Sequence, residues 1–199
     1  LFLRLGPERH VCFLTGAGPQ AWETVMGFNP AEVFSVKAGG IKALTAFVER
    51  SLQNRRKLIG YISYDLGCAL HRVSLTVRDD LGLPDIFFCA FDNYIRFAGH
   101  AASIHYTDPL FPDMVAAIIR RPPRPVEQTS GSPFIAECTR QQYARAFKKI
   151  KRYIYNGDSY QINLTHRLRA ETLLPARTLF ANIMEKNPVG FLAYIEGNG

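Results

Sequence analysis

A chain of 199 residues can hold one large domain, or one modest domain together with part of another. Hydrophobic residues make up 47% and charged residues 21%, an ordinary globular composition that excludes general disorder. The net charge of +7 comes from dispersed basic residues, with no stacking or helix-turn-helix motif, so we expect no nucleic-acid partner. No apolar run approaches the roughly 20 residues that span a bilayer, so we expect no membrane partner.

The four cysteines lie far apart and form no Cys-x-x-Cys pair: they are Cys12, Cys68, Cys89 and Cys138. Three of them fall within apolar stretches, which is typical of small buried hydrophobic residues. This pattern favours a reducing compartment over a disulfide framework and predicts a cytoplasmic protein. The histidines show no metal-ligand spacing with one another or with the cysteines, so we assign no metal ligand.

The first part of the chain alternates short strand-like runs with helices. The helix expected over residues 42–54 carries an apolar stripe at helical spacing. Strands and helices without regular βαβ alternation favour an α+β fold with antiparallel sheets and flanking helices. The other elements expected here are strands over 11–15, 33–37, 86–91, 94–97 and 103–106 and a short helix over 114–120.

The best candidate for a domain boundary is residues 121–133. This stretch holds four prolines, at positions 122, 123, 125 and 133, together with Ser, Thr and Gly. Because proline lacks a backbone donor and biases its predecessor towards extended geometry, no helix can continue through the stretch. The sequence therefore predicts an N-terminal domain over 1–120, a linker over 121–133 and a second domain over 134–199.

The second domain opens with the clearest local signals in the chain. Thr139 and Gln142 have the spacing of a capping box. Apolar residues then follow at intervals of four, three and four, and Gly157 is suited to end that helix. From Tyr160 to Leu168 apolar and polar residues alternate, which predicts a strand.

The end of the chain predicts a helix over 175–186, stopped by Asn187-Pro188, and a strand over 191–195. The last three residues, Gly197-Asn198-Gly199, are a turn signal without a strand to follow. Because these elements leave strand edges unpaired, we expect the second domain to be incomplete.

Several motifs resemble landmarks of one enzyme family. The segment Asn156-Gly157-Asp158-Ser159-Tyr160-Gln161-Ile162-Asn163-Leu164, preceded by Thr139-Arg140-Gln141-Gln142-Tyr143 and Ile150, resembles the opening of the chorismate-binding domain of aminodeoxychorismate and anthranilate synthase component I. Its Asn-Leu ending resembles the aminodeoxychorismate branch, since anthranilate synthases usually have apolar residues there. The remaining landmarks come in the family's order: Gly27-Phe28-Asn29-Pro30, Gly60-Tyr61-Ile62-Ser63-Tyr64-Asp65-Leu66-Gly67, Leu83-Pro84-Asp85 and Asn187-Pro188-Val189-Gly190-Phe191.

The resemblance implies a transferase that aminates chorismate to 4-amino-4-deoxychorismate, the precursor of 4-aminobenzoate in folate synthesis. Such enzymes bind chorismate with Mg²⁺ held by glutamates, and a glutamine amidotransferase subunit or fused domain supplies ammonia. The aminodeoxychorismate branch also uses the lysine of a Pro-Ile-Lys-Gly-Thr segment as a nucleophile, where anthranilate synthase has alanine. Neither that segment nor the paired glutamates lie in residues 1–199. We therefore assign no catalytic residue and expect residues 1–199 alone to be inactive.

The resemblance also implies an effector site for tryptophan, with one half at the first strand and the other at Gly190, Phe191 and Leu192. This chain departs from the family pattern at three places. Gly16 replaces a serine, Ala21-Trp22 replaces a Ser-Arg pair, and Gly190 replaces a proline. Because a serine hydroxyl and an arginine would pair the charged groups of an amino acid, we expect tryptophan to bind weakly or not at all.

Gln161 and Asn163 face away from the apolar side of their expected strand. They are candidates for lining a polar substrate cavity, and simple exposure to solvent is the equal alternative. Two alternatives to the function also stay open, namely anthranilate synthase component I and a non-catalytic binding module. The residues encoded after Gly199 would separate them: Pro-Ile-Lys-Gly-Thr, Pro-Ile-Ala-Gly-Thr or a stop codon.

Overall fold

The computed structural model describes residues 1–6, 8–18, 23–37, 39–74, 79–99, 101–123 and 131–197. These residues belong to two compact units, one made of Leu1–Pro125 with Ala176–Gly199 and the other of Val126–Pro175. The expected α+β fold with antiparallel sheets and flanking helices is confirmed. Within the ranges just given, no helix is both long and apolar enough to cross a membrane.

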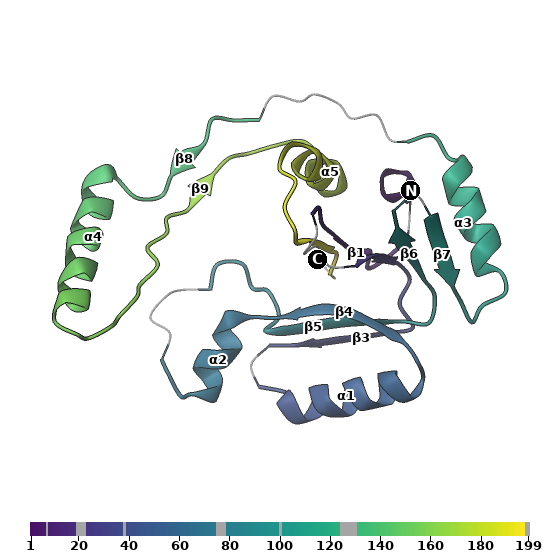
Figure 1. Ribbon diagram of the computed structural model, residues 1–199, viewed down its shortest axis with the longest axis horizontal. Helices are drawn as coiled ribbons and strands as arrows, with labels where there is room; N and C mark the ends of the chain where they lie inside the picture. The colour runs from purple at the N-terminus through teal and green to yellow at the C-terminus, as the bar shows by residue number, and fades with distance from the viewer. Residues whose placement is uncertain are drawn as a thin grey trace. The chain divides into compact units, whose positions relative to one another are not determined.

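The first unit contains a five-stranded antiparallel sheet in the order β10-β1-β2-β6-β7 (Figure 1). Residues from the far end of the sequence therefore form an edge strand beside β1. Its strands are β1 (Cys12–Thr15), β2 (Thr24–Gly27), β6 (Tyr94–Ala98), β7 (Ala101–His105) and β10 (Leu192–Ile195).

One face of this sheet packs against three helical segments: η1 (Phe2–Arg4), α3 (Phe111–Arg120) and α5 (Ala176–Lys186). Aromatic rings dominate the core on this face. Phe2 stacks on Phe13 at 5.1 Å and meets Phe180 edge-on at 5.7 Å, both distances between ring centroids. Since each of these three rings is nearly fully buried, their burial is a main source of stability for the unit.

The same unit contains a three-stranded antiparallel sheet in the order β3-β5-β4. Helix α1 (Ile41–Gln53) lies along this sheet (Figure 1). The Phe47 ring of α1 packs on the Phe34 ring of β3, with centroids 5.2 Å apart. Ser63 caps the short helix α2 (Tyr64–Leu70) by accepting a hydrogen bond from the Leu66 amide. The strands are β3 (Glu32–Val36), β4 (Lys57–Ile62) and β5 (Ile86–Phe91).

The two sheets share a second core cluster made of Cys12, Val25, Ile59, Phe87, Cys89 and Phe91. Cys12 and Cys89 are fully buried, as expected for small hydrophobic residues. A hydrogen bond with Cys89 and burial raise the pKa of the Cys12 thiol, so it stays protonated at neutral pH.

The second unit is small and open. Its helix α4 (Arg140–Tyr155) begins with the expected capping box, in which Gln142 N–H donates to the Thr139 hydroxyl and Thr139 N–H donates to the Gln142 side chain. A two-stranded ladder joins β8 (Ile135–Ala136) to β9 (Leu168–Arg169). No residue of α4 is fully buried, because its apolar stripe has little of this unit to pack against.

The strand expected over residues 160–168 is wrong for most of its length. Residues 160–166 have an irregular backbone and the Arg167 carbonyl oxygen accepts a hydrogen bond from the Glu137 amide at 3.0 Å, but only Leu168–Arg169 enters a ladder. Five elements had no expectation from the sequence, namely η1, β2, β4, α2 and β8. The predicted limits 1–120, 121–133 and 134–199 stay a prediction, and residues 124–130 of that linker lie outside the described residues.

Candidate functional site

The two predicted halves of the effector site lie side by side in the structure. Strand β10 pairs antiparallel with β1, so that Leu192 is opposite Thr15 and Ile195 is opposite Cys12. Just beyond this ladder, the Ala17 amide donates a hydrogen bond of 2.9 Å to the carbonyl oxygen of Val189. Backbone pairing thus places Gly190 and Phe191 at the end of β1, and we call this region the β1–β10 junction.

The three candidate residues at the junction differ in burial. Leu192 packs against the aromatic core that contains Phe13, whereas the Phe191 side chain is 58% exposed. Among the residues that the structure describes, a Cβ atom at Gly190 would meet only the Ala17 carbonyl oxygen, at an ordinary contact distance of 3.7 Å. The junction therefore presents one exposed aromatic ring beside a backbone with room for a side chain, and the effector role stays a prediction.

Two hydroxyl groups lie near the junction. The hydroxyl groups of Thr15 and Thr24, on neighbouring strands, lie 3.2 Å apart. Gly16 is half-buried and brings no hydroxyl, while Ala21 and Trp22 lie outside the described residues. Hydroxyls and an aromatic ring are groups that bind small molecules.

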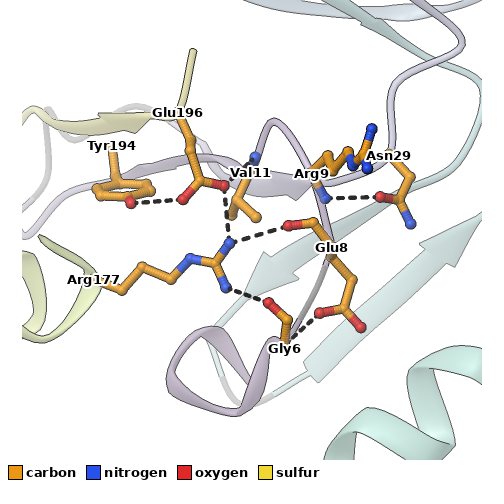
Figure 2. Close-up of polar contacts among 8 residues, drawn as sticks. All are labelled: Gly6, Glu8, Arg9, Val11, Asn29, Arg177, Tyr194 and Glu196. Carbon is orange, nitrogen blue, oxygen red and sulfur yellow. Dashed lines mark hydrogen bonds and ion pairs between the residues drawn. The ribbon is translucent and has the colours of Figure 1, made fainter. Parts of the chain in front are cut away.

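A network of polar contacts fixes the far end of β10, and Figure 2 shows it around Arg177 and Glu196. The Arg177 guanidinium donates to the Glu196 carboxylate at 2.9 Å and to the carbonyl oxygens of Glu8 and Gly6 at 3.2 and 3.4 Å. Glu196 also accepts from the Tyr194 hydroxyl at 3.1 Å. We call these five residues the Arg177 network.

The same network holds β10 against β1. The Val11 amide donates to the Glu196 carboxylate at 3.3 Å, and the Glu196 amide donates to the Val11 carbonyl oxygen at 3.0 Å. One arginine of α5 thus links the N-terminal segment to the end of β10. The Arg177 network therefore holds β10 at the end of the strand opposite the β1–β10 junction.

The contacts of the Arg177 network lower the pKa of the Glu196 carboxyl group. Partial burial pushes its pKa upwards, but the hydrogen bonds and positive charge of Arg177, with the donors Val11 and Tyr194, leave the pKa below its ordinary value. Burial and the neighbouring Glu196 charge raise the pKa of the Tyr194 hydroxyl. At neutral pH the pair is therefore an ionised carboxylate and a protonated phenol.

The N-terminal landmark motifs meet through backbone and side-chain contacts. The Ser63 hydroxyl donates to the Asp85 carboxylate at 3.0 Å, and the Ser63 amide donates to the Asp85 carbonyl oxygen at 2.7 Å. Gly60 lies so close to the backbone of Phe88 that a side chain there would be 2.6 Å from the Phe88 Cα atom. These contacts give the landmarks a structural role in joining β4 to β5.

Gln161 and Asn163 lie in the second unit, and both are exposed. The Ser159 hydroxyl donates to the Gln161 carbonyl oxygen at 2.9 Å, which shapes the turn that follows α4. Their assignment to a substrate cavity stays a prediction. Across the described parts of both units, no three His, Cys, Asp or Glu side chains gather closely enough to hold a metal ion.

Sequence reasoning missed Arg177 and Glu196. Their bond spans 19 positions and also needs residues 6–11 at the other end of the chain, so no helical or strand periodicity marks it. A charged residue in the first turn of an amphipathic helix looks like any solvated side chain until its partner is in place. Only the tertiary structure identifies this pair.

The comparisons with known proteins agree on one family. A family model described as chorismate binding enzyme matches residues 11–199. The chain is 28% identical over 156 residues to aminodeoxychorismate synthase component 1 of Bacillus subtilis, covering 69% of this chain and 33% of that protein. It is 25% identical over 233 residues to anthranilate synthase component 1 1 of Haloarcula marismortui, covering 100% of this chain and 48% of that protein.

A solved structure supports the fold. The anthranilate synthase component I of Streptococcus pneumoniae superposes with a TM-score of 0.66 at 17% identity, covering 86% of this chain and 46% of that protein. The chain thus spans between a third and a half of the length of these relatives.

Proposed function

The chain belongs to the chorismate-binding enzyme family, and from that premise we propose that it is part of an enzyme that aminates chorismate to 4-amino-4-deoxychorismate. That product leads to 4-aminobenzoate and folate. The observation that carries the proposal is the motif Tyr160-Gln161-Ile162-Asn163-Leu164, whose Asn-Leu ending resembles the aminodeoxychorismate branch. The 28% identity to the Bacillus subtilis aminodeoxychorismate synthase component 1 supports it.

In the whole protein we propose that chorismate binds with Mg²⁺ and that a glutamine amidotransferase subunit or fused domain supplies ammonia. A magnesium ion suits a dianionic substrate, because it prefers oxygen ligands and helps a hydroxyl group to leave. We propose that it acts through ligands other than the described residues, which hold no cluster of acidic side chains suited to a metal. Such chemistry belongs in the cytoplasm, where we place the protein.

Within this chain, Gln161 and Asn163 are our candidates for lining the substrate cavity. Both are exposed on an irregular segment directly after α4. Amide side chains there could donate hydrogen bonds to a carboxylate or hydroxyl of chorismate without adding charge. We propose Gly190, Phe191 and Leu192 as part of an effector site at the β1–β10 junction, with weak affinity for tryptophan.

Anthranilate synthase component I is the second candidate. It is favoured by the match to the Haloarcula marismortui anthranilate synthase, which covers 100% of this chain. The two candidates share substrate and ammonia source and differ in product, so product identity separates them.

The test is an assay of the whole protein with chorismate, Mg²⁺ and ammonium, with chromatographic separation of products. We expect 4-amino-4-deoxychorismate, and anthranilate as the main product would overturn the proposal in favour of the second candidate. The codons after Gly199 give an independent check, since the proposal expects Pro-Ile-Lys-Gly-Thr downstream. Failure to detect either product would contradict both candidates and favour a binding module.

A substitution of Gln161 tests whether this residue lines the substrate cavity. We expect Gln161→Ala to lower kcat/KM at least about tenfold, because one substrate hydrogen bond is lost. Gln141→Ala removes an equally exposed amide from α4 and serves as the matched control. Equal activity of the two variants would show that Gln161 only faces solvent.

A further inference from the structure

A separate hollow lies between the sheet β3-β5-β4 and the end of β10. It has a volume of about 470 Å³ and contains none of the residues Gly190, Phe191 and Leu192. Pockets of roughly 300–1,000 Å³ are typical small-molecule sites. Its walls are Ser35, Tyr61 and Phe87 on one side, Ile195 and Gly197 on the other, and the loop of residues 81–84 at the end.

The sheet side of the hollow is a wall with two aromatic side chains, Tyr61 and the nearly fully buried Phe87. In the strand register Phe87 of β5 is opposite both Ser35 of β3 and Tyr61 of β4, so the three side chains share one face. The rings of Tyr61 and Phe87 lie nearly parallel, with centroids 5.9 Å apart and planes 24° apart. Such a wall matches the flat face of an aromatic ring.

The loop that closes one end of the hollow is fastened by Lys37. Its ammonium group donates to the Asp79 carboxylate at 2.5 Å and to the Leu83 carbonyl oxygen at 2.6 Å. Asp79 in turn accepts from the amides of Leu81 and Gly82, at 3.2 and 3.0 Å. Because the Lys37 charge is paired with Asp79, the hollow offers little attraction to an anion.

Among the described residues of the lining, two side chains are polar, the hydroxyl groups of Ser35 and Tyr61. Burial raises the pKa of the Tyr61 hydroxyl, and the Lys37 charge opposes that shift. The phenol is therefore protonated at neutral pH and can donate a hydrogen bond.

From this geometry we propose that the hollow binds a small, neutral, flat aromatic molecule that carries one hydrogen-bonding group. Its ring would lie against Tyr61 and Phe87, and its polar group would bond to the hydroxyl of Tyr61. The proposal is independent of the chemistry assigned to the whole protein, since it uses no residue of the candidate substrate cavity.

Three probes of equal size test the proposal by ligand-observed NMR on the 199-residue chain. Phenol has both the ring and the hydroxyl, toluene has the ring alone, and cyclohexanol has the hydroxyl alone. We expect a phenol Kd on the order of 1 mM and weaker binding of the other two. Cyclohexanol binding as tightly as phenol, or no phenol signal at about 10 mM, would overturn the proposal.

Substitutions in the lining test whether phenol binds in the hollow. Tyr61→Phe should weaken phenol about threefold to tenfold and leave toluene unchanged, because only a hydrogen bond is lost. Ser35→Leu should fill the hollow and abolish phenol binding, whereas Ser103→Leu, on an exposed position of β7, should leave it intact. If Ser35→Leu has a lower Tm than Ser103→Leu, a second variant is needed that fills the hollow without changing β3. Gly197→Leu serves, because a Cβ atom at Gly197 would lie 3.8 Å from the Phe87 ring on the opposite wall. Phenol binding that survives a folded, filled variant contradicts the proposal.

Discussion

Replacing Arg177 with methionine removes the centre of the polar network in Figure 2 while keeping an unbranched apolar side chain. The Arg177 side chain is only 13% exposed, so its partners are shielded from water. The substitution leaves the Glu196 carboxylate without its cation and frees the carbonyl oxygens of Gly6 and Glu8. We expect a clear loss of stability in the first unit.

The magnitude follows from the bonds lost. A hydrogen bond to a charged group contributes about 1.5–3 kcal/mol, and removing a partner from a buried group adds to the cost. Glu196 remains 32% exposed, so water recovers part of its lost interaction and limits the loss. We therefore expect the free energy of unfolding to fall by about 3 kcal/mol, or about 6–12 °C in Tm for a protein of this size.

Urea unfolding followed by circular dichroism measures the free energy of unfolding directly. Arg9→Met is the matched control, because Arg9 lies in the N-terminal segment that Arg177 contacts but is itself exposed. It should change stability by less than about 0.5 kcal/mol. Arg177→Lys keeps the charge but loses the forked geometry, and should fall between the two. If Arg177→Met and Arg9→Met unfold alike, the network does not hold β10 in place and the reasoning fails.

Three further predictions test other parts of the structure. Gly60→Ala should destabilise the first unit by more than about 3 kcal/mol in urea unfolding, since a Cβ atom would lie 2.6 Å from the Phe88 Cα atom and closer still to the Phe87 carbonyl oxygen. Thr139→Ala should cost α4 about 1 kcal/mol by removing its capping hydroxyl, seen as lower helicity, whereas Thr139→Ser should not. Because the folded-state pKa of Glu196 is depressed, its stabilising effect is present above its ordinary value of 4.5 and is lost as pH falls through the folded value. The stability gap between the native chain and Glu196→Gln should therefore narrow between pH 7 and pH 3, and a constant gap would contradict the ion pair.

Local signals predicted local structure well in this chain. The capping box at Thr139 and the four-three-four spacing that follows it fixed the start and face of α4, because these interactions involve only neighbours in the sequence. The strand expected over residues 11–15 likewise matches β1. Nothing local indicated that β1 pairs with β10 across some 180 positions. The family resemblance implied only that the first strand and residues 190–192 contribute to one effector site.

One of the elements without an expectation, β4, was hidden for a physical reason. Strand β4 contains Gly60, a residue that disfavours strands in general. It is tolerated here because the neighbouring backbone at Phe88 approaches too closely for a side chain. Gly60 therefore makes β4 hard to predict from the sequence, and the same residue allows β4 to pack against β5.

The segment from Tyr160 to Leu168 shows the limit of periodicity as a predictor. Its alternation is real, yet residues 160–167 form no ladder, and only Leu168 and Arg169 pair, with Ala136 and Ile135. A strand needs a partner for its backbone hydrogen bonds, and a pattern of side chains cannot supply one. The pattern describes which faces would be apolar once a partner is present. Gln161 and Asn163 therefore share a face only if such pairing occurs, and their proposed role in a substrate cavity depends on it.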